Sequence, residues 1–241
     1  MASFLPFDSP SSMIMSDDVR RHFLPYIHIH FFEAGITRNH SISISVHATF
    51  VESEFLERIY PELALRNAHN ISDLFINRII LSTRDFDVDM LNRILLGRLN
   101  GPAHIFNSFD HTDLNHIARD RDGMTTEYLR TIAVASLPPG ALHVRIGCLL
   151  MLMSNLDPQH GLRSGARMTL LRAGHRCLEV RLLGGEFDGQ SQLIYRQSLS
   201  TVDNLPFRLT RRQFPVKLAF ALNIYKSQGR SFEHVGIVLP Y

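Results

Sequence analysis

A helical spacing of hydrophobic residues begins after Glu52. Phe55, Ile59 and Leu63 recur every four residues, which places their side chains on one face of a helix. Pro61 lies late in this pattern, and a proline inside a helix removes a backbone hydrogen bond. We therefore expect a helix that ends or bends near Pro61.

The next pattern is a strand, a polar turn and a helix. Residues 78–82 read RIILS, a short apolar run, and Thr83, Arg84 and Asp85 follow it as the turn. Helical spacing then returns at Val88, Leu91, Ile94 and Leu95. A strand that leads into an amphipathic helix is the repeating unit of a parallel α/β sheet, and such sheets bind ligands at the carboxyl ends of their strands. This turn is therefore a candidate ligand-binding segment.

After Leu99 the pattern changes from α/β to β. Residues 100–123 are polar and rich in turn-forming residues, which predicts a connection out of the α/β unit. Hydrophobic and polar positions then alternate over residues 144–152 and 178–182, and apolar runs occur within GARMTLL (165–171) and QLIYRQSL. Several short strands with glycine turns predict a small β-barrel or sandwich inserted into the α/β domain.

The pattern near the carboxyl end predicts a strand, whereas the pattern in residues 1–50 predicts no defined structure. Residues 216–224 and 235–240 are apolar, and the polar loop YKSQGRS separates them, so we expect a buried strand at 235–240. No helix follows that strand to cover the sheet, which leads us to expect a truncated domain. HIHFF and SISISV, within residues 1–50, are strand-like but have no partner pattern, so this segment is left unassigned.

Composition and charge narrow the class of protein only slightly. Hydrophobic residues make up 45% of the 241 residues and charged residues 20%, which is usual for a folded domain. Lys and Arg exceed Asp and Glu by two, so there is no general attraction for nucleic acid. A basic surface must therefore be local, as at Arg208, Arg211 and Arg212.

Cysteine usage and hydropathy bear on the compartment. Cys148 and Cys177 lie in apolar strand-like runs, where buried free thiols are expected ahead of a disulfide, and free thiols fit a reducing compartment. No apolar run reaches the roughly 18 residues that a membrane span requires, and the N-terminus does not have the pattern of a secretion signal. We expect neither a membrane span nor secretion.

Two patterns that imitate metal sites are set aside. Asp85, Asp87 and Asp89 resemble the start of a calcium loop, but Met90 and Leu96 replace the required glycine and glutamate, so a solvated helix start is expected. Among the 13 histidines, His28 and His30 have no Cys or carboxylate at ligand spacing, and His104, His111 and His116 lie in a polar connection. No metal site is predicted.

Three segments resemble a known family. The stretch RRQFPVKLAFALNIYKSQGRSF at residues 211–232, followed by VGIVLP, is similar to the segment around motif V of PIF-type (petite integration frequency) DNA helicases of superfamily one. Residues 78–92 resemble the strand, turn and helix around motif IV, and residues 137–168 resemble the barrel inserted between those motifs. The resemblance covers roughly residues 52–241, and it is nearest to Helitron-encoded helicases.

The resemblance implies an α/β fold, namely a partial second RecA-like domain of the P-loop NTPase type with an inserted small β-barrel. Residues 52–107 would begin this domain and contain the motif IV region. Residues 108–200 would form the barrel with its connection, and residues 201–241 the truncated return with motif V. Residues 1–51 would remain an unassigned N-terminal segment.

The resemblance also implies the site residues. In the family, the Lys-Ser-Gln-Gly loop lies between the single-stranded DNA track and the bound ATP. Asn223, Tyr225, Lys226 and Ser227 would lie toward DNA, although the family usually has threonine at the first of these positions and histidine or asparagine at the second. The residues implied to lie toward the nucleotide are Gln228, Gly229 and Arg84. A structural salt bridge is the alternative role of Arg84, and a solvated turn is the alternative for the loop.

Several parts of such a motor are missing from the sequence. It contains no G-x-x-x-x-G-K-[ST] phosphate loop, we identify no Asp-Glu pair for magnesium, and the arginine-bearing motif VI would begin beyond Tyr241. We therefore expect a fragment of an ATP-dependent 5′–3′ DNA helicase that is not active alone. ATP and magnesium belong to the intact family enzyme, and none is expected for this chain alone.

The expected partner is single-stranded DNA, bound weakly, and a first RecA-like domain would be needed for activity. By the same resemblance the expected setting is the nucleus, with roles in DNA repair, recombination and telomere maintenance. Two alternatives stay open: a non-enzymatic module that binds single-stranded nucleic acid, and an inactive transposon remnant.

Overall fold

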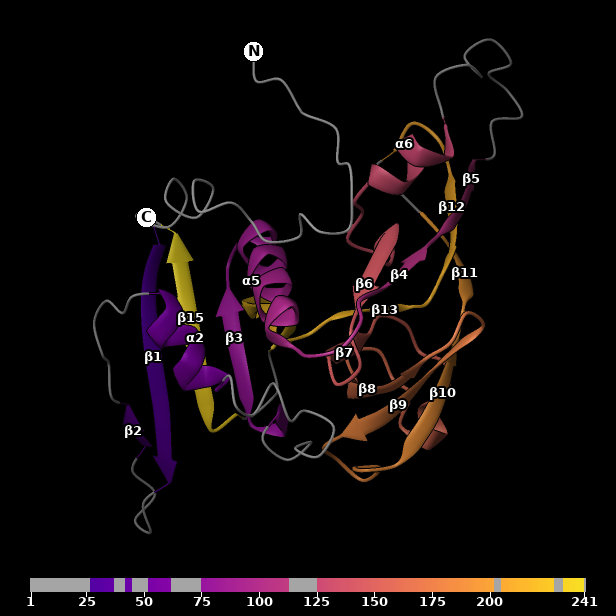
Figure 1. Cartoon of the computed structure of the whole chain (residues 1–241). Coiled ribbons are helices and arrows are strands. Elements are labelled where there is room, and N and C mark those ends of the chain that lie inside the picture. Colours follow the sequence, from indigo (N-terminus) through magenta and orange to yellow (C-terminus); the bar gives the residue numbers. More distant parts are fainter. Residues whose placement is uncertain are drawn as a thin grey trace, which may run out of the picture.

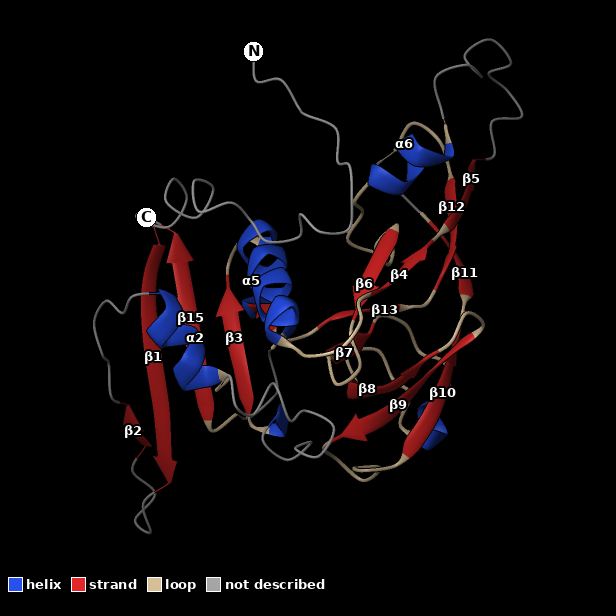
Figure 2. Ribbon diagram, in the orientation of Figure 1, coloured by secondary structure: helices blue, strands red, loops and turns tan. Residues whose placement is uncertain are grey.

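The computed structural model describes residues 27–36, 42–44, 52–61, 75–112, 125–201, 205–227 and 232–240. These residues form two regions that lie side by side, a mixed sheet with helices and a group of antiparallel strands (Figure 1). Helices lie mainly with the mixed sheet, whereas strands and loops make up most of the second region (Figure 2).

The mixed sheet has the strand order β14-β3-β15-β1-β2. Its strands are β14 (Ala221–Asn223), β3 (Arg78–Ser82), β15 (His234–Pro240), β1 (Ile27–Ile36) and β2 (Ile42–Ile44). β3 runs parallel to both β14 and β15, which confirms the parallel α/β unit and the two strands that the apolar runs predicted. β3 is buried along most of its length, whereas β15, expected to be a buried strand, has only Gly236 and Val238 buried among its residues 234–239. The α/β class is therefore correct.

The strand-like run that the sequence left without a partner pairs with the end of the chain. β1 lies antiparallel to β15, from Ile27 opposite Pro240 to Glu33 opposite His234. β2 then continues the sheet beside β1. This pairing joins residues about 200 positions apart, so no local pattern points to it.

Two helices pack on the mixed sheet. In α2 (Glu52–Ile59), Phe55 and Ile59 are fully buried, and the phenyl ring of Phe55 lies directly over Gly236 of β15, where a Cβ atom would clash. Pro61 follows the end of α2, as expected, whereas Leu63 lies outside the described residues. The second helix, α5 (Asp85–Arg98), buries the predicted hydrophobic stripe against β3 and β14.

The second region consists of three small antiparallel sheets, with strand orders β10-β9-β8-β7-β13, β11-β12-β5 and β4-β6. The strands of the first sheet are β7 (Leu149–Leu152), β8 (Arg167–Ala173), β9 (Cys177–Leu183), β10 (Ser191–Tyr195) and β13 (Val216–Leu218). Those of the other two are β4 (His104–Asn107), β5 (Phe109–Thr112), β6 (Ala141–Val144), β11 (Gln197–Ser200) and β12 (Leu209–Gln213). The short helices are α6 (Thr126–Thr131), η2 (Pro158–His160) and η3 (Ile224–Lys226).

The predicted closed barrel is not found among the described strands. The chain turns a corner at Arg196, where β10 ends and β11 begins in another sheet, and again at residues 214–215 between β12 and β13. Because the strands change sheet at these corners, their hydrogen bonds do not continue around one ring. The inserted region is therefore an assembly of open sheets.

Two further expectations about this region need correction. The alternation over residues 144–152 is divided between β6 and β7, because the chain turns at Gly147, whose φ of 85° favours glycine. Residues 100–123 were expected to be a connection, yet they contain β4 and β5. β5 finds its partner in β12, about 100 residues later, so the pairing depends on the tertiary fold.

One hydrophobic core runs through both regions. It contains Leu91 and Leu95 of α5 together with Leu150 of β7 and Val180 of β9. The segment from Phe214 to Leu222, buried along most of its length, passes from the antiparallel region into the mixed sheet. The two regions are therefore packed together through a shared apolar interior.

Candidate nucleic-acid interface

The turns that follow β3 and β14 lie next to each other. The two strands are parallel neighbours, with Asn223 opposite Ser82 at their carboxyl ends. The polar turn at residues 83–85 and the loop that begins at residue 224 therefore leave the same edge of the sheet. This is the edge at which open α/β sheets bind ligands.

Asn223 joins these two turns. Its Nδ2 atom donates hydrogen bonds to Asp85 Oδ1 at 3.0 Å and to the carbonyl oxygen of Thr83 at 3.3 Å. Its Oδ1 atom accepts a hydrogen bond from the backbone N–H of Tyr225 at 3.2 Å. A side chain predicted to lie toward DNA thus also connects the loop after β14 to the turn after β3.

The loop after β14 starts with the short helix η3 and presents two exposed side chains. Tyr225 is 80% exposed, and Lys226 is exposed beside it. Ser227 is part of the local turn, because its hydroxyl donates to the carbonyl oxygen of Ile224 at 2.7 Å. Gln228 and Gly229 lie outside the described residues, so their predicted position toward a nucleotide stays a prediction.

Arg84 forms the ion pair that was its alternative role. Its Nε and Nη2 atoms donate to the two carboxylate oxygens of Asp87, at 2.8 and 3.1 Å. Asp87 is only 1% exposed and also accepts a hydrogen bond from Ser82 Oγ at 3.3 Å, so the expectation of a fully solvated helix start is wrong for this residue. The Arg84 side chain is still 50% exposed, and its role toward a nucleotide stays a prediction.

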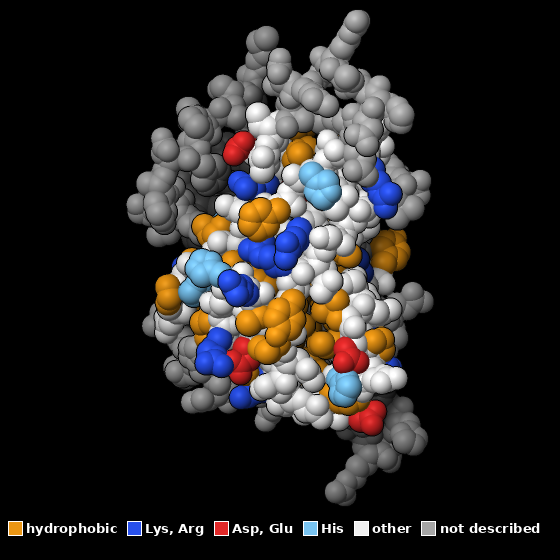
Figure 3. Space-filling view, turned by 90° about the vertical axis from the view of Figure 1, so that its right-hand side faces the viewer, with side chains coloured by type: hydrophobic (Ala, Val, Ile, Leu, Met, Phe, Trp, Pro, Cys, Tyr) orange, Lys and Arg blue, Asp and Glu red, His pale blue; other side chains and the backbone are white. Residues whose placement is uncertain are grey.

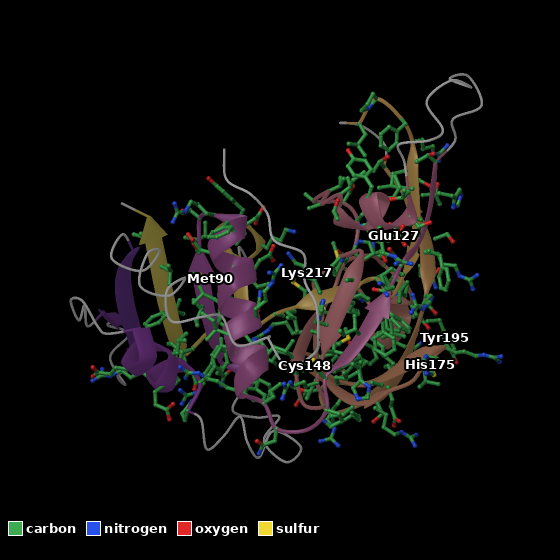
Figure 4. The ribbon with its side chains drawn as sticks, turned by 45° about the horizontal axis from the view of Figure 1, so that its top comes forward. Met90, Glu127, Cys148, His175, Tyr195 and Lys217 are labelled. Carbon is green, nitrogen blue, oxygen red and sulfur yellow. The ribbon has the colours of Figure 1, made fainter. Side chains whose placement is uncertain are left out.

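A second lysine lies close to this edge. Lys217 of β13 lies between α5 and the antiparallel strands (Figure 4). Its pKa is lowered to about 8, first by burial and then by the positive charge of Lys226, while Asp85 and Asp89 oppose the shift. The two lysines are therefore close enough to repel each other, and the acidic residues at the start of α5 partly compensate them.

The predicted local basic surface is only partly correct. Arg208 and Arg212 are exposed, but Arg211 is 1% exposed and belongs to the interior. Its guanidinium pairs with the buried carboxylate of Asp110 at 2.9 Å and donates to the carbonyl oxygens of Leu129, Ile132 and Pro138. From the sequence, Arg211 is expected at the surface because it stands among other basic residues. Its partner Asp110 is about 100 residues away, so the sequence gives no sign that this charge is neutralised in the interior.

The remaining candidate chemistry in the described residues is limited. Cys148 and Cys177 are free, as expected, and burial raises the pKa of the Cys148 thiol to about 12. Cys177 is only half-buried. Among the described side chains, no group of three His, Cys, Asp or Glu residues is placed to hold a metal ion. Of the helices that the structure describes, none has the length and apolar character to cross a membrane.

One structural residue of this edge was missed by sequence reasoning. The buried amide of Asn92 on α5 accepts hydrogen bonds from the backbone N–H groups of Phe220 and Ala221, and it donates to the carbonyl oxygen of Ala221, all at 3.0 Å. It thereby holds β14 against α5. The sequence did contain a signal for this role, because the polar Asn92 lies directly beside the apolar stripe that Leu91 and Leu95 form on this helix.

Known proteins that resemble the chain are PIF1 helicases. The model of the 2B domain of the DNA helicase Pif1 matches residues 127–172. The ATP-dependent DNA helicase PIF1 of Danio rerio is 30% identical over 162 residues, which are 66% of this chain and 23% of that protein. The corresponding protein of Rattus norvegicus is 30% identical over 188 residues, or 76% of this chain and 26% of that protein. The chain thus spans about a quarter of the length of these relatives.

Solved structures with a similar arrangement are also Pif1 proteins. Pif1 helicase from Candida albicans aligns with a TM-score of 0.48 and 22% identity, over 75% of this chain and 46% of that chain. Bacteroides Pif1 bound to ssDNA aligns with a TM-score of 0.45 and 19% identity, over 77% of this chain and 42% of that chain. On the sequence matches, the chain is homologous to PIF1-type DNA helicases and corresponds to their C-terminal portion.

Proposed function

We propose that this chain supplies the second RecA-like part of a PIF1-type, ATP-dependent 5′–3′ DNA helicase. The mixed sheet with α2 and α5 would form that part, and the antiparallel sheets, which contain the strands from β4 to β13, would form the region inserted into it. The observation that carries the proposal is the shared edge at which the turn after β3 and the loop after β14 are joined by Asn223. The relatives named above are ATP-dependent DNA helicases, which gives the proposal its reaction class.

The exposed side chains of the loop suit a single strand of DNA. Tyr225 offers an aromatic ring on which a base can stack, and Lys226 offers a positive charge for a phosphate. Asn223 and Ser227 would hold the loop in place and add polar contacts to the strand.

The turn after β3 would face the nucleotide. Arg84 would contact it together with Gln228 and Gly229 of the loop. Asn223 would then link the nucleotide side to the DNA side, because it bonds both to the turn that precedes α5 and to the backbone of Tyr225. A shift of one turn would displace the other, which is how hydrolysis would be coupled to movement along DNA.

Nucleotide hydrolysis would need a further domain. The phosphate loop and the acidic residues that hold magnesium belong to a first RecA-like domain in enzymes of this kind, and the sequence of this chain contains no phosphate loop. The chain alone is therefore expected to bind single-stranded DNA weakly and to show no DNA-stimulated ATP hydrolysis. Action in the nucleus, and a relation to Helitron-encoded helicases, remain part of the proposal.

Fluorescence anisotropy with a labelled oligo(dT) tests the DNA contact. Tyr225→Ala should weaken binding by about 1–3 kcal/mol, because one stacked base is lost. Lys226→Ala should weaken it and reduce the slope of log K against log salt by about 0.7, the value for one phosphate contact on a single strand. Tyr128→Ala on α6 and Arg176→Ala on the β8–β9 turn are exposed controls that should leave binding unchanged. Unchanged affinity in both loop variants would contradict the proposal.

A second candidate is a binding module that uses no nucleotide. The exposed aromatic and basic side chains on the antiparallel region, described below, favour it. In that case the variants of Tyr225 and Lys226 would bind as the natural chain does, and only changes at those exposed aromatic and basic side chains would weaken binding. The same anisotropy series therefore separates the two candidates.

A further inference from the structure

Arg196 is held rigidly at the corner between β10 and β11. Its Nη1 atom donates to the carbonyl oxygen of Asn107 at 2.9 Å and to Gln213 Oε1 at 3.0 Å. Its guanidinium carbon also lies 4.7 Å from the ring centroid of Phe214 and 5.5 Å from that of Phe109. An arginine fixed by hydrogen bonds and flanked by rings presents its charge in one defined place.

Phe109 and Arg212 lie next to this arginine on the outer face of the three-stranded sheet. The strand register places Ser198 of β11, Arg212 of β12 and Phe109 of β5 in one row. Phe109 is 64% exposed, and Arg212 is exposed beside it. Seen from the side of β10, β11 and β12, basic and hydrophobic side chains lie next to one another over the middle of the face (Figure 3). We call Phe109, Arg196 and Arg212 the outer aromatic patch.

The outer aromatic patch is electrostatically positive. The pKa of Arg196 is lowered by burial and then by the charge of Arg212, so the two guanidinium groups lie close to each other. Asp110 follows Phe109 in β5, but its carboxylate is fully buried and pairs with Arg211 on the inner side of the sheet. This nearby acid therefore neutralises an interior charge and leaves the outer face positive.

We propose that the outer aromatic patch is a second contact surface for single-stranded nucleic acid, separate from the edge at β3 and β14. A base would stack on the exposed ring of Phe109, and Arg212, with Arg196 behind it, would contact the adjacent phosphates. An exposed aromatic ring between two cations suits a flexible single strand, whose bases are free to leave their neighbours. A duplex would offer the ring no open base.

A tryptophan probe tests this stacking directly, because the chain contains no tryptophan. Phe109→Trp should retain the affinity for oligo(dT), and its fluorescence should be quenched when the oligonucleotide binds. Gln190→Trp is the matched control, since Gln190 is exposed and lies at the opposite end of β10 from the Arg196 corner. An oligonucleotide with abasic sites should quench the Phe109→Trp probe much less than oligo(dT) does.

Two truncations complete the test. Phe109→Ala should raise the Kd for oligo(dT) at least about fivefold, the equivalent of losing one stacked base. Arg212→Gln should reduce the salt slope by about 0.7. Both positions are exposed, so circular dichroism and the thermal midpoint should match those of the natural chain.

The outcomes of this test and of the loop test are distinct. Equal affinity in Phe109→Ala and the natural chain, with no quenching of the tryptophan probe, would overturn the outer aromatic patch and leave this face to a protein partner. That result would not bear on the DNA contact proposed for the loop after β14, which Tyr225→Ala and Lys226→Ala test separately. If both pairs of variants weaken binding, a strand long enough to reach both surfaces should bind more tightly than a short one.

Discussion

Each of the two regions of this protein connects distant segments through a buried polar side chain, and these two side chains, Asn92 and Arg211, differ in charge. In the mixed sheet, the neutral amide of Asn92 makes three hydrogen bonds at 3.0 Å to the backbone of residues 220–221. In the antiparallel region, the charged Arg211 pairs with Asp110 and donates to three carbonyl oxygens of residues 129–138. Both side chains connect segments that are far apart in the sequence, but Asn92 is neutral whereas Arg211 is charged.

The difference follows from the kind of hydrogen-bond partner that each segment requires. β14 is three residues long and runs beside α5, so one amide that both donates and accepts is sufficient to hold it there. Residues 129–138 are the end of α6 and an irregular segment whose carbonyl groups need donors only, and arginine is the side chain with the most N–H groups. The use of arginine then requires a buried carboxylate, which Asp110 supplies.

The largest expected loss of stability comes from breaking the buried ion pair between Arg211 and Asp110. Arg211→Met should destabilise the chain by about 3–5 kcal/mol, because it leaves Asp110 buried without its partner. Urea unfolding followed by circular dichroism measures this change. Arg212→Met, at the exposed neighbouring position, is the control and should change stability by less than about 0.5 kcal/mol. Equal stability of the two variants would show that the ion pair is not needed for folding.

Removing the uncharged hydrogen bonds of Asn92 should lower the free energy of unfolding by a smaller amount. Asn92→Leu should cost about 2–3 kcal/mol, because backbone groups of Phe220 and Ala221 lose their partner while no charge is left unpaired. The same urea titration applies, with Arg93→Gln on the exposed side of α5 as the control. A loss as large as that of Arg211→Met would contradict the distinction between a neutral and a charged connection.

The third prediction concerns Lys217, which lies between the two regions. Its pKa is lowered to about 8 in the folded chain from an ordinary value of 10.5, chiefly by burial, so the unfolded chain binds more protons between these values. The free energy of unfolding should therefore rise with pH from about 8 toward 10.5. Lys217→Met should remove part of this rise and should make the chain more stable at pH 7, since the buried charge is gone.

Urea titrations at pH 7, 8, 9 and 10 test this dependence. Lys226→Met is the matched control, because it removes the repelling neighbour and keeps Lys217 itself. The control variant should be intermediate at pH 7 and should keep part of the rise with pH. A Lys217→Met variant that is less stable than the natural chain at pH 7 would show that the acidic partners Asp85 and Asp89 outweigh burial.

Local patterns were sufficient for much of the mixed sheet. The apolar run at 78–82 is β3, the helical stripe that begins at Val88 lies in α5, and α2 ends before Pro61. These features depend on neighbours within a few residues in the sequence, such as a repeat of hydrophobic positions or a proline. The motif near the carboxyl end likewise predicted the PIF-type family, and the sequence matches to PIF1 helicases confirm that family.

The arrangement of the candidate surfaces was decided by the tertiary structure. The sequence named Asn223, Tyr225 and Lys226, yet only the parallel register of β3 and β14 shows that Asn223 joins the two turns. The open sheets of the inserted region replaced the predicted barrel because strands change sheet at corners, which depends on partners about 100 residues away.

By itself, the sequence determined the strand at residues 78–82, the helices that begin near Glu52 and Asp85, the end of α2 before Pro61, and the family to which the chain is related. It did not determine β1, β2, β4 or β5, which lie in segments that the sequence leaves unassigned or predicts to be a connection. The tertiary structure alone decided which charges face inward, as for Arg211, and which aromatic rings gather around one cation, as for Arg196. The physical reason is the range of the forces. Periodicity and chain stiffness act between near neighbours, whereas ion pairs, ring contacts and strand pairing join residues that are distant in the chain.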